Sequence, residues 1–375
     1  MKPKRALNAA YIHIPFCLDK CYYCNFISFS DKKDLIEEYL KSLYVEIERE
    51  LSKQEKINLK SIYIGGGTHS ILDASCYSKI LDIMSRKTSF LSDIEITIEA
   101  NPATIDINYL KSLLNAGINR ISIGVQSFNE GILKSLNRKH TSKDAIDAIN
   151  MAHEAGFNNI SIDLMYGLPA QTLEIWHNTL NIAINSGIKH ISAYGLKIEE
   201  ETPFAKNLPE KLPCEESCVE MYLEAIDILT EAVYEHYEIS NYAVSGYESR
   251  HNLSYWLNEE YFGFGLGAHG YVNGIRYSNS CNLDQYINDP LKKESAQALS
   301  NTEIIEEGIF LGLRLTKGIN IQQFQEEYGI DILKKHKNTV DKYIRYGYME
   351  FKEGCLSLTD SGILISNTIL ADFIT

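Results

Sequence analysis

The sequence has no apolar run as long as the roughly 20 residues that a membrane-spanning helix needs. Its first ten residues are basic, but the apolar stretch that follows is too short for a secretory signal peptide. We therefore expect a cytoplasmic protein with no membrane span. Its eight cysteines are expected to be free thiols, because a reducing compartment disfavours disulfides.

Positive charge is scarce. The chain has 36 Lys and Arg against 50 Asp and Glu, which gives a formal net charge of -14. Nucleic-acid binding needs clustered Lys and Arg to neutralise phosphates, so we expect no nucleic-acid partner. Internal repeats and low-complexity linkers are also absent, which excludes a repeat array. The 375 residues, 45% of them hydrophobic, can bury a large core and predict more than one domain.

What the chain does have is a tight group of three cysteines, Cys17, Cys21 and Cys24, directly after a short apolar strand at 11–14. Thiolates held this close together by one loop are typical of iron–sulfur clusters or zinc. A four-iron cluster needs four ligands, so three cysteines would leave one iron open to a small molecule. The alternative is a structural zinc site with His13 or a distant residue as fourth ligand, although zinc sites favour paired Cys-x-x-Cys units.

The Cys-x3-Cys-x2-Cys spacing, with aromatic Tyr23 just before the last cysteine, resembles the radical S-adenosylmethionine (SAM) superfamily. The resemblance implies a [4Fe-4S] cluster held by Cys17, Cys21 and Cys24. It also implies that the open iron chelates the amino and carboxylate groups of SAM, whose reductive cleavage yields a 5′-deoxyadenosyl radical.

Strand and helix patterns alternate along the first half of the chain. Strands are expected at 11–14, 59–64, 93–98, 119–128, 160–169 and 190–196, and helices at 31–53, 109–116, 145–155 and 176–185. This alternation predicts an α/β protein with a parallel sheet, whose active edge lies at the carboxyl ends of the strands. Six such units resemble the incomplete (β/α)6 barrel of radical SAM enzymes.

Glycines and polar residues follow these strands. The run Gly65-Gly66-Gly67-Thr68 lets the backbone approach a ligand and exposes its N–H groups. Taken singly, the polar residues at the other strand ends are typical of a solvated rim or an ion pair. Together, the strings Glu99-Ala100-Asn101-Pro102, Gly124-Val125-Gln126-Ser127-Phe128 and Asp163-Leu164-Met165-Tyr166-Gly167-Leu168-Pro169 resemble the branch that contains the coproporphyrinogen III dehydrogenase HemN and the haem chaperone HemW.

That resemblance implies a SAM pocket made of eight residues: Tyr11, Gly66, Gly67, Thr68, Glu99, Gln126, Arg138 and Asp163. Carboxylates in such a pocket can accept ribose hydroxyls or pair with a sulfonium, and amides can bond an adenine edge. The chain departs from the branch at two places. His69 replaces a proline after the glycine run, and Asn137 stands where glycine is common.

Two histidines lie in further motifs. Arg250-His251-Asn252-Leu253-Ser254-Tyr255-Trp256 resembles the HNxxYW motif of HemW proteins, which implies His251 as a haem ligand. Neutral imidazole is a common axial ligand, and the aromatic residues could contact a porphyrin face. On composition alone, a lone His beside aromatics is more often structural. The glycine-rich string at 263–271 resembles a loop that closes the SAM face, and it makes His269 a second candidate for contact with SAM or haem.

After residue 301 the pattern changes to helices at 304–315, 321–328 and 330–346, a hairpin at about 348–359, and a last helix. Helices followed by a hairpin predict a small winged-helix-like domain, which resembles the C-terminal domain of HemW proteins. We therefore divide the chain into a radical SAM partial barrel with its closing segment at 1–295 and a C-terminal helical domain at 296–375. Because the chain is acidic overall, we expect this C-terminal domain to have a structural or protein-docking role and not to bind DNA.

Three functions follow. The first is a haem chaperone that binds haem as cargo and passes it to respiratory proteins. The second is a dehydrogenase that decarboxylates coproporphyrinogen III, and the third is a zinc-stabilised interaction protein. HemN-type dehydrogenases have a further cysteine where this chain has Phe26, and a longer extension than the residues ahead of Tyr11, so the chaperone is favoured. The resemblance also implies a homodimer and peripheral association with the membrane.

Overall fold

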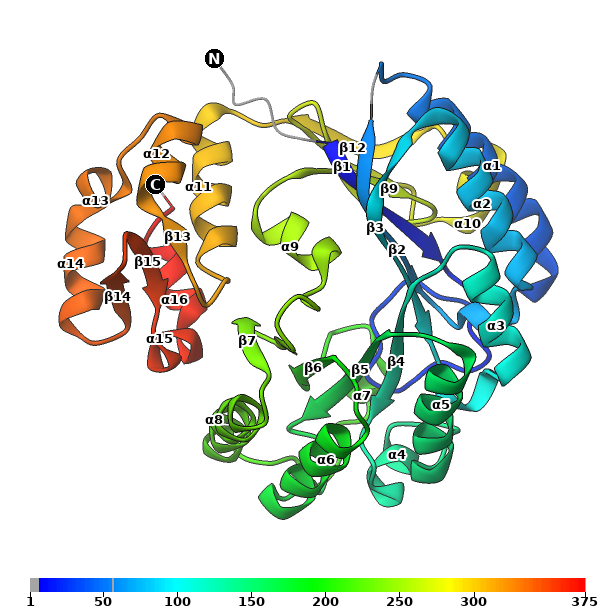
Figure 1. The fold of residues 1–375 in the computed structure, drawn as a ribbon, viewed down its shortest axis with the longest axis horizontal. Helices are drawn as coiled ribbons and strands as arrows, with labels where there is room; N and C mark the ends of the chain where they lie inside the picture. Colours follow the sequence, from blue (N-terminus) through cyan, green and yellow to red (C-terminus); the bar gives the residue numbers. More distant parts are fainter. Residues whose placement is uncertain (1–6, 56, 375) are drawn as a thin grey trace.

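The computed structural model describes residues 7–55 and 57–374. Figure 1 shows a curved sheet that forms an open ring, with helices around its outside and the C-terminal helices on the side of the gap. The sheet has twelve strands in the order β12-β11-β10-β9-β1-β2-β3-β4-β5-β6-β8-β7. No helix in the described residues is long and apolar enough to cross a membrane.

Six neighbouring strands of this sheet are parallel, as the sequence predicts. They are β1 (Leu7–Ile14), β2 (Asn58–Gly66), β3 (Ser89–Ala100), β4 (Arg120–Gln126), β5 (Asn159–Tyr166) and β6 (His190–Gly195). The helices between them are α1 (Ile36–Leu51), α2 (Ala74–Lys87), α3 (Ile107–Asn115), α4 (Glu130–Ser135), α5 (Ser142–Ala155) and α6 (Leu173–Asn185). Each strand contributes a buried isoleucine to the layer beneath these helices: Ile12, Ile62, Ile98, Ile121, Ile162 and Ile191. The α/β class and the six-unit partial barrel are thereby confirmed.

Antiparallel strands extend the sheet on both sides. Next to β1, the strand β9 (Glu260–Phe264) runs parallel and leads into β10 (His269–Val272), β11 (Ile275–Asn279) and β12 (Lys293–Ala298). Next to β6 lie β8 (Asn241–Ala243) and β7 (Glu235–Glu238), preceded by helix α8 (Glu215–Glu231). The stretch 237–243 looks like one strand in the sequence, but the chain turns at 239–240 and β7 pairs with β8. Within the described residues, no strand pairing joins β12 to β7, so the ring stays open.

The C-terminal part has helices around a three-stranded sheet in the order β13-β15-β14. Its elements are α11 (Asn301–Gly312), β13 (Ile319–Asn320), α12 (Ile321–Tyr328), α13 (Ile332–Lys335), α14 (Lys337–Arg345), β14 (Met349–Lys352), β15 (Cys355–Leu358), α15 (Asp360–Leu364) and α16 (Ser366–Ala371). The predicted winged-helix-like arrangement of helices and hairpin is present. The helix predicted over 330–346 breaks at His336, and the last helix breaks at Ile365.

Residues 301–316, which we call the bridging segment, span the gap in the ring. At one end, Glu307 forms an ion pair with Arg276 of β11 at 2.7 Å. At the other end, Leu315 forms a β-bridge with Glu238 of β7, and Thr316 N–H donates to the carbonyl of Tyr237 at 3.2 Å. The two edges of the open sheet are therefore connected through this segment.

Candidate functional site

The carboxyl ends of the parallel strands surround a cavity of about 350 Å³. Ten of the residues implied by the sequence line it: Cys17, Cys21, Cys24, Gly66, Gly67, Thr68, Glu99, Gln126, Arg138 and Asp163. These residues are up to about 150 positions apart in the chain (from 17 to 163), and they meet because parallel strands end at a common edge. The structure therefore brings these ten residues together at one edge of the sheet.

The three cysteines lie on one loop after β1 whose base is closed by backbone hydrogen bonds. Cys17 N–H donates to the Phe29 carbonyl at 2.9 Å, and Phe29 N–H donates to the Pro15 carbonyl at 2.8 Å. Burial raises the pKa of the Cys17 thiol, and it raises the pKa of the Cys24 thiol to about 11. Binding of iron or zinc here would therefore release protons, since the metal ligand is the thiolate.

The described residues do not form a ready four-ligand zinc site around the three cysteines. Within the described residues, no three His, Cys, Asp or Glu side chains converge on one point that could hold a metal ion. His13 is not available as the fourth zinc ligand, because Nδ1 bonds the Tyr11 hydroxyl at 2.9 Å and Nε2 bonds the Ile27 carbonyl at 2.8 Å. Three thiols spread around a shared cavity suit a larger inorganic centre.

The glycine run lies against the start of the cysteine loop. Gly67 N–H donates to the Ile14 carbonyl at 2.8 Å, and Thr68 N–H donates to the Phe16 carbonyl at 2.7 Å. A Cβ on Gly67 would lie 2.2 Å from the Phe16 carbonyl oxygen, and Gly66 has φ +122°. Glycine is thus required at both positions, by contact at one and by backbone conformation at the other.

Glu99 lies partly buried at the edge of the cavity. Its carboxylate accepts hydrogen bonds from the Tyr63 hydroxyl at 2.9 Å and from Gly66 N–H at 3.1 Å. Burial, and then the negative charge of Asp163, raise the pKa of Glu99 to about 7. A cationic ligand beside this carboxyl would favour its ionised form, because opposite charge opposes both effects.

Asp163 lies deeper, together with a residue that the sequence analysis missed. Its carboxylate accepts from Ser122 Oγ at 3.2 Å, and burial raises its pKa. Arg120, only 2% exposed, also lines the cavity wall, and its Nη1 lies 3.5 Å from Thr97 Oγ1. A charged residue at the start of the apolar strand β4 was the signal that could have identified Arg120.

Arg138 and its neighbour connect α4 to the cysteine loop. Arg138 Nη1 donates to Cys21 Sγ at 3.5 Å, and its Nη2 donates to the Gly124 carbonyl. Asn137 has φ +59°, and its Nδ2 donates to the Lys20 carbonyl at 2.9 Å. The left-handed conformation explains why glycine suits this position and why asparagine also fits it.

His69, the other departure from the branch, does not line the cavity. It is 1% exposed, neither ring nitrogen makes a well-formed hydrogen bond within the part of the chain that the structure describes, and burial lowers its pKa to about 4. Its backbone carbonyl accepts from the hydroxyls of Tyr77 and Tyr109. The neutral ring therefore packs behind the glycine run as an apolar group would.

Three residues implied by the sequence do not line this cavity. Tyr11 lies one layer behind, with its ring stacked on that of Tyr63 at 6.2 Å. His251, on α9 (Arg250–Trp256), is 1% exposed, and its ring nitrogens bond Ser61 Oγ at 3.2 Å and the Tyr255 hydroxyl at 2.8 Å. Burial lowers the pKa of His251 to about 3, so it is neutral at physiological pH.

His269 lies exposed at the start of β10, in a separate groove whose other lining residues include Tyr261, Arg276 and Tyr277. By contrast Asn252, the residue after His251, does line the main cavity. The HNxxYW motif therefore presents its asparagine, and not its histidine, to the candidate site.

Residues 11–183 match the Radical SAM superfamily, and residues 299–365 match the HemN C-terminal domain. The chain is 38% identical to the heme chaperone HemW of Bacillus subtilis (strain 168), over 98% of this chain and 99% of the relative. It is 33% identical to the heme chaperone HemW of Escherichia coli (strain K12), over 97% of each. The solved structure of E. coli coproporphyrinogen III oxidase (HemN) shares the fold, with a TM-score of 0.87 at 23% identity over 100% of this chain and 91% of that one.

The six parallel strands, the three-cysteine loop and the full-length similarity agree. The chain belongs to the HemW family of the radical SAM superfamily.

Proposed function

We propose that this protein is a haem chaperone: it binds haem and passes it to respiratory proteins. The observation that carries the proposal is identity of 33–38% over nearly the whole length to bacterial relatives that are named heme chaperone HemW. The C-terminal part is included in that similarity, so the likeness extends beyond the barrel common to radical SAM proteins.

The cavity supports a [4Fe-4S] cluster on Cys17, Cys21 and Cys24, with SAM beside it. When bound, the reduced cluster supplies one electron to SAM. The carboxylates of Glu99 and Asp163 offer the acceptors that the amino group and ribose hydroxyls of SAM need, and the glycine run lets a ligand approach the backbone closely. Arg138 places its guanidinium against Cys21, with Nη1 donating to Sγ at 3.5 Å.

The family motif favours His251 as the haem ligand, but a hydrogen bond in the structure must break before this residue can bind iron. Iron can reach Nε2 of His251 only after the Tyr255 hydroxyl releases that nitrogen. His269 is exposed and needs no such release. Histidine is a common axial ligand of haem iron, so both residues are candidates.

The test is a titration of the cluster-reconstituted protein with haem, followed by Soret absorption. We expect His251→Ala to weaken haem binding at least about tenfold, since an axial ligand is lost. Tyr255→Phe frees Nε2 and is expected to bind haem at least as tightly as the parent. His153→Ala, an exposed histidine bonded to the Ser186 carbonyl, is the control. Unchanged binding in His251→Ala with loss in His269→Ala would move the ligand to His269.

An anaerobic assay with coproporphyrinogen III, SAM and a reductant tests the alternative activity. The chaperone proposal predicts no decarboxylated product under conditions in which HemN forms it. Product formation at a rate comparable to HemN would replace the proposal by the dehydrogenase reading. An iron-free, zinc-containing protein after anaerobic purification would contradict both.

We also propose that the protein is cytoplasmic, forms a homodimer and associates with the membrane surface without spanning it. Light scattering of the purified protein tests the dimer, and sedimentation with vesicles of bacterial lipid composition tests the surface association. A monomer would contradict the dimer. Protein that stays entirely in the supernatant would contradict the association with the membrane surface.

A further inference from the structure

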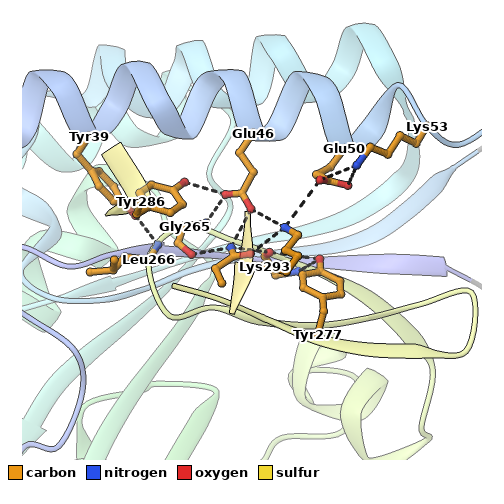
Figure 2. A network of polar contacts seen from close by, with 11 residues as sticks. Tyr39, Glu46, Glu50, Lys53, Gly265, Leu266, Tyr277, Tyr286 and Lys293 are labelled. Atoms are coloured by element: carbon orange, nitrogen blue, oxygen red, sulfur yellow. Dashed lines mark hydrogen bonds and ion pairs between the residues drawn. The ribbon is translucent and has the colours of Figure 1, made fainter. Parts of the chain in front are cut away.

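A buried carboxylate on α1 holds the loop that follows β9. Glu46 is 0% exposed, and each of its carboxylate oxygens accepts two hydrogen bonds. Oε2 accepts from Gly265 N–H at 2.8 Å and from the Tyr286 hydroxyl at 2.7 Å. Oε1 accepts from Asn279 Nδ2 at 2.8 Å and from the Lys293 ammonium at 3.0 Å (Figure 2). The charge is thus both paired and fully hydrogen-bonded.

The partners of Glu46 also bind one another. Asn279 Nδ2 donates to the Gly265 carbonyl at 2.7 Å, and Asn279 Oδ1 accepts from Lys293 Nζ at 2.8 Å. Lys293 also lies 4.5 Å above the ring centre of Tyr277 (Figure 2). Removal of one side chain would leave buried donors or acceptors unpaired. The stability lost in that way is larger than the net contribution of the hydrogen bond itself. Helix α1, residues 263–268, β11 and β12 are therefore held together as one unit.

The loop at 263–268 lies directly against the strand that leads into the cysteine loop. Gly265 has φ +95°, and a Cβ there would lie 2.5 Å from the His13 carbonyl oxygen. Tyr39, seven residues before Glu46 and so on the same face of α1, donates to that carbonyl at 2.6 Å. The same Tyr39 hydroxyl accepts from Leu266 N–H at 3.1 Å. One helix face thus fixes both the loop and the end of β1.

The loop also contacts the chain that leaves the last cysteine. A Cβ on Gly267 would lie 2.4 Å from Ile27 Cδ1, so the Ile27 side chain packs directly against the Gly267 backbone. Ile27 is three residues after Cys24, and its carbonyl bonds His13 Nε2 at 2.8 Å. A shift of the loop would therefore be transmitted to residues 25–29, the segment that determines where Cys24 lies.

We propose that Glu46, paired with Lys293, is a positioning residue for the inorganic centre. It fixes residues 263–268, which in turn hold residues 25–29 and the thiol of Cys24. The identity of the centre as a [4Fe-4S] cluster rests on the proposed function. The mechanical connection from Glu46 to residues 25–29 does not depend on that identity.

Hydrogen exchange followed by mass spectrometry tests the connection in the full-length protein, before and after anaerobic reconstitution. In Glu46→Gln, peptides that cover 263–268 and 25–29 should both exchange about tenfold faster, because a charged hydrogen-bond acceptor is lost. The control is Glu37→Gln, on the same helix, whose carboxylate is exposed and pairs only with Lys41 among the described residues. Faster exchange at 263–268 alone, or at neither segment, would overturn the proposal.

A second variant covers the case in which Glu46→Gln does not fold. Lys293→Met, in the edge strand β12, removes the ammonium group that pairs with Glu46 Oε1. The same faster exchange at 263–268 and 25–29 is expected, and the same failures would overturn the proposal. After reconstitution, iron should leave Glu46→Gln or Lys293→Met at least several-fold faster than it leaves the parent or Glu37→Gln. Equal rates would overturn the role in positioning. Absence of iron from the parent itself would instead contradict the proposed function, while the exchange result would still decide the connection.

Discussion

Among single residues, Glu99 is a carboxyl of the candidate site whose pKa the fold raises well above its ordinary value. Its raised pKa of about 7 means that the folded protein binds this proton more tightly than the unfolded chain does. The stabilisation that this gives is complete below the ordinary glutamate pKa of 4.5. It is lost as the pH rises through about 7, where the carboxyl must ionise beside Asp163.

The prediction is a smaller dependence of stability on pH in Glu99→Gln. The amide cannot ionise, so between pH 5 and 8 its melting temperature should fall less than that of the parent, in unliganded protein. Thermal unfolding in buffers of equal ionic strength measures this. Parallel curves for parent and variant across that range would show that Glu99 has an ordinary pKa.

The candidate ligand-binding residues at strand ends could be predicted from the sequence. The positions of residues buried inside the ring could not. The glycine run, Glu99 and Asp163 stand at positions where a ligand is expected in any parallel sheet. Arg120 and Glu46 are charged residues in apolar patterns, and only the fold shows which groups compensate them. The place of His251 depends on where α9 lies within the ring, which its local sequence does not encode.

Among the elements, the cysteine loop is held from outside by the residue that follows α4. Asn137 adopts a left-handed conformation and donates to the Lys20 carbonyl at 2.9 Å. A glycine would remove the bond but relax the backbone, whereas an alanine would remove the bond and keep the strain.

We therefore expect Asn137→Gly to change the free energy of unfolding by no more than about 1 kcal/mol and Asn137→Ala to lower it by about 2 kcal/mol. Urea denaturation measures both. Asn273→Ala is the matched control, since Asn273 has a similar φ of +54° but is exposed, and its Nδ2 donates only a long, exposed hydrogen bond to Gln54 Oε1 at 3.4 Å among the described residues. If the two alanine variants lose equal stability, the bond to Lys20 contributes nothing.

Elements with strong periodicity were predicted correctly, and those set by tertiary contacts were not. The six parallel strands and α12 follow directly from runs of apolar residues and helical spacing. The hairpin at 235–243 looks like one strand in sequence, because the turn at 239–240 contains no glycine or proline. The helix predicted over 330–346 keeps its apolar spacing through His336, so the break there has no signal in the pattern.

In the molecule as a whole, the bridging segment replaces the strands that a closed barrel would have. Its contact with the β12 side depends on side chains. Arg276 Nε and Nη2 donate to the two oxygens of Glu307 at 3.1 and 2.7 Å, and both side chains are 29% exposed. Tyr271 packs with Leu299 and Ile304 beneath this pair. Its contact with β7 uses backbone hydrogen bonds instead.

A double-mutant cycle with Arg276→Met and Glu307→Gln should give a coupling energy of about 1 kcal/mol, since the pair is bidentate and half-buried. The exposed pair Lys337–Asp341 on α14 is the comparison, and about 0.3–0.5 kcal/mol is expected there. Chemical denaturation of the single and double variants measures both. Equal coupling in the two pairs would mean that the Arg276–Glu307 contact does not hold the ring together.

Because the bridging segment ends at residue 316, the order of synthesis matters for this fold. At about 5–20 residues per second, the ribosome delivers residue 316 on the order of ten seconds after β6 has been completed. During that interval the nascent chain exposes the unpaired edge strands of the sheet and the polar interior of the ring. Exposed sheet edges of this kind can bind chaperones or pair with other chains. The three cysteines are made much earlier, but the loop at 263–268 and Lys293, which we propose position them, are made only shortly before the bridging segment. Correct placement of the metal ligands and closure of the ring are therefore late and nearly coincident events in the life of the chain.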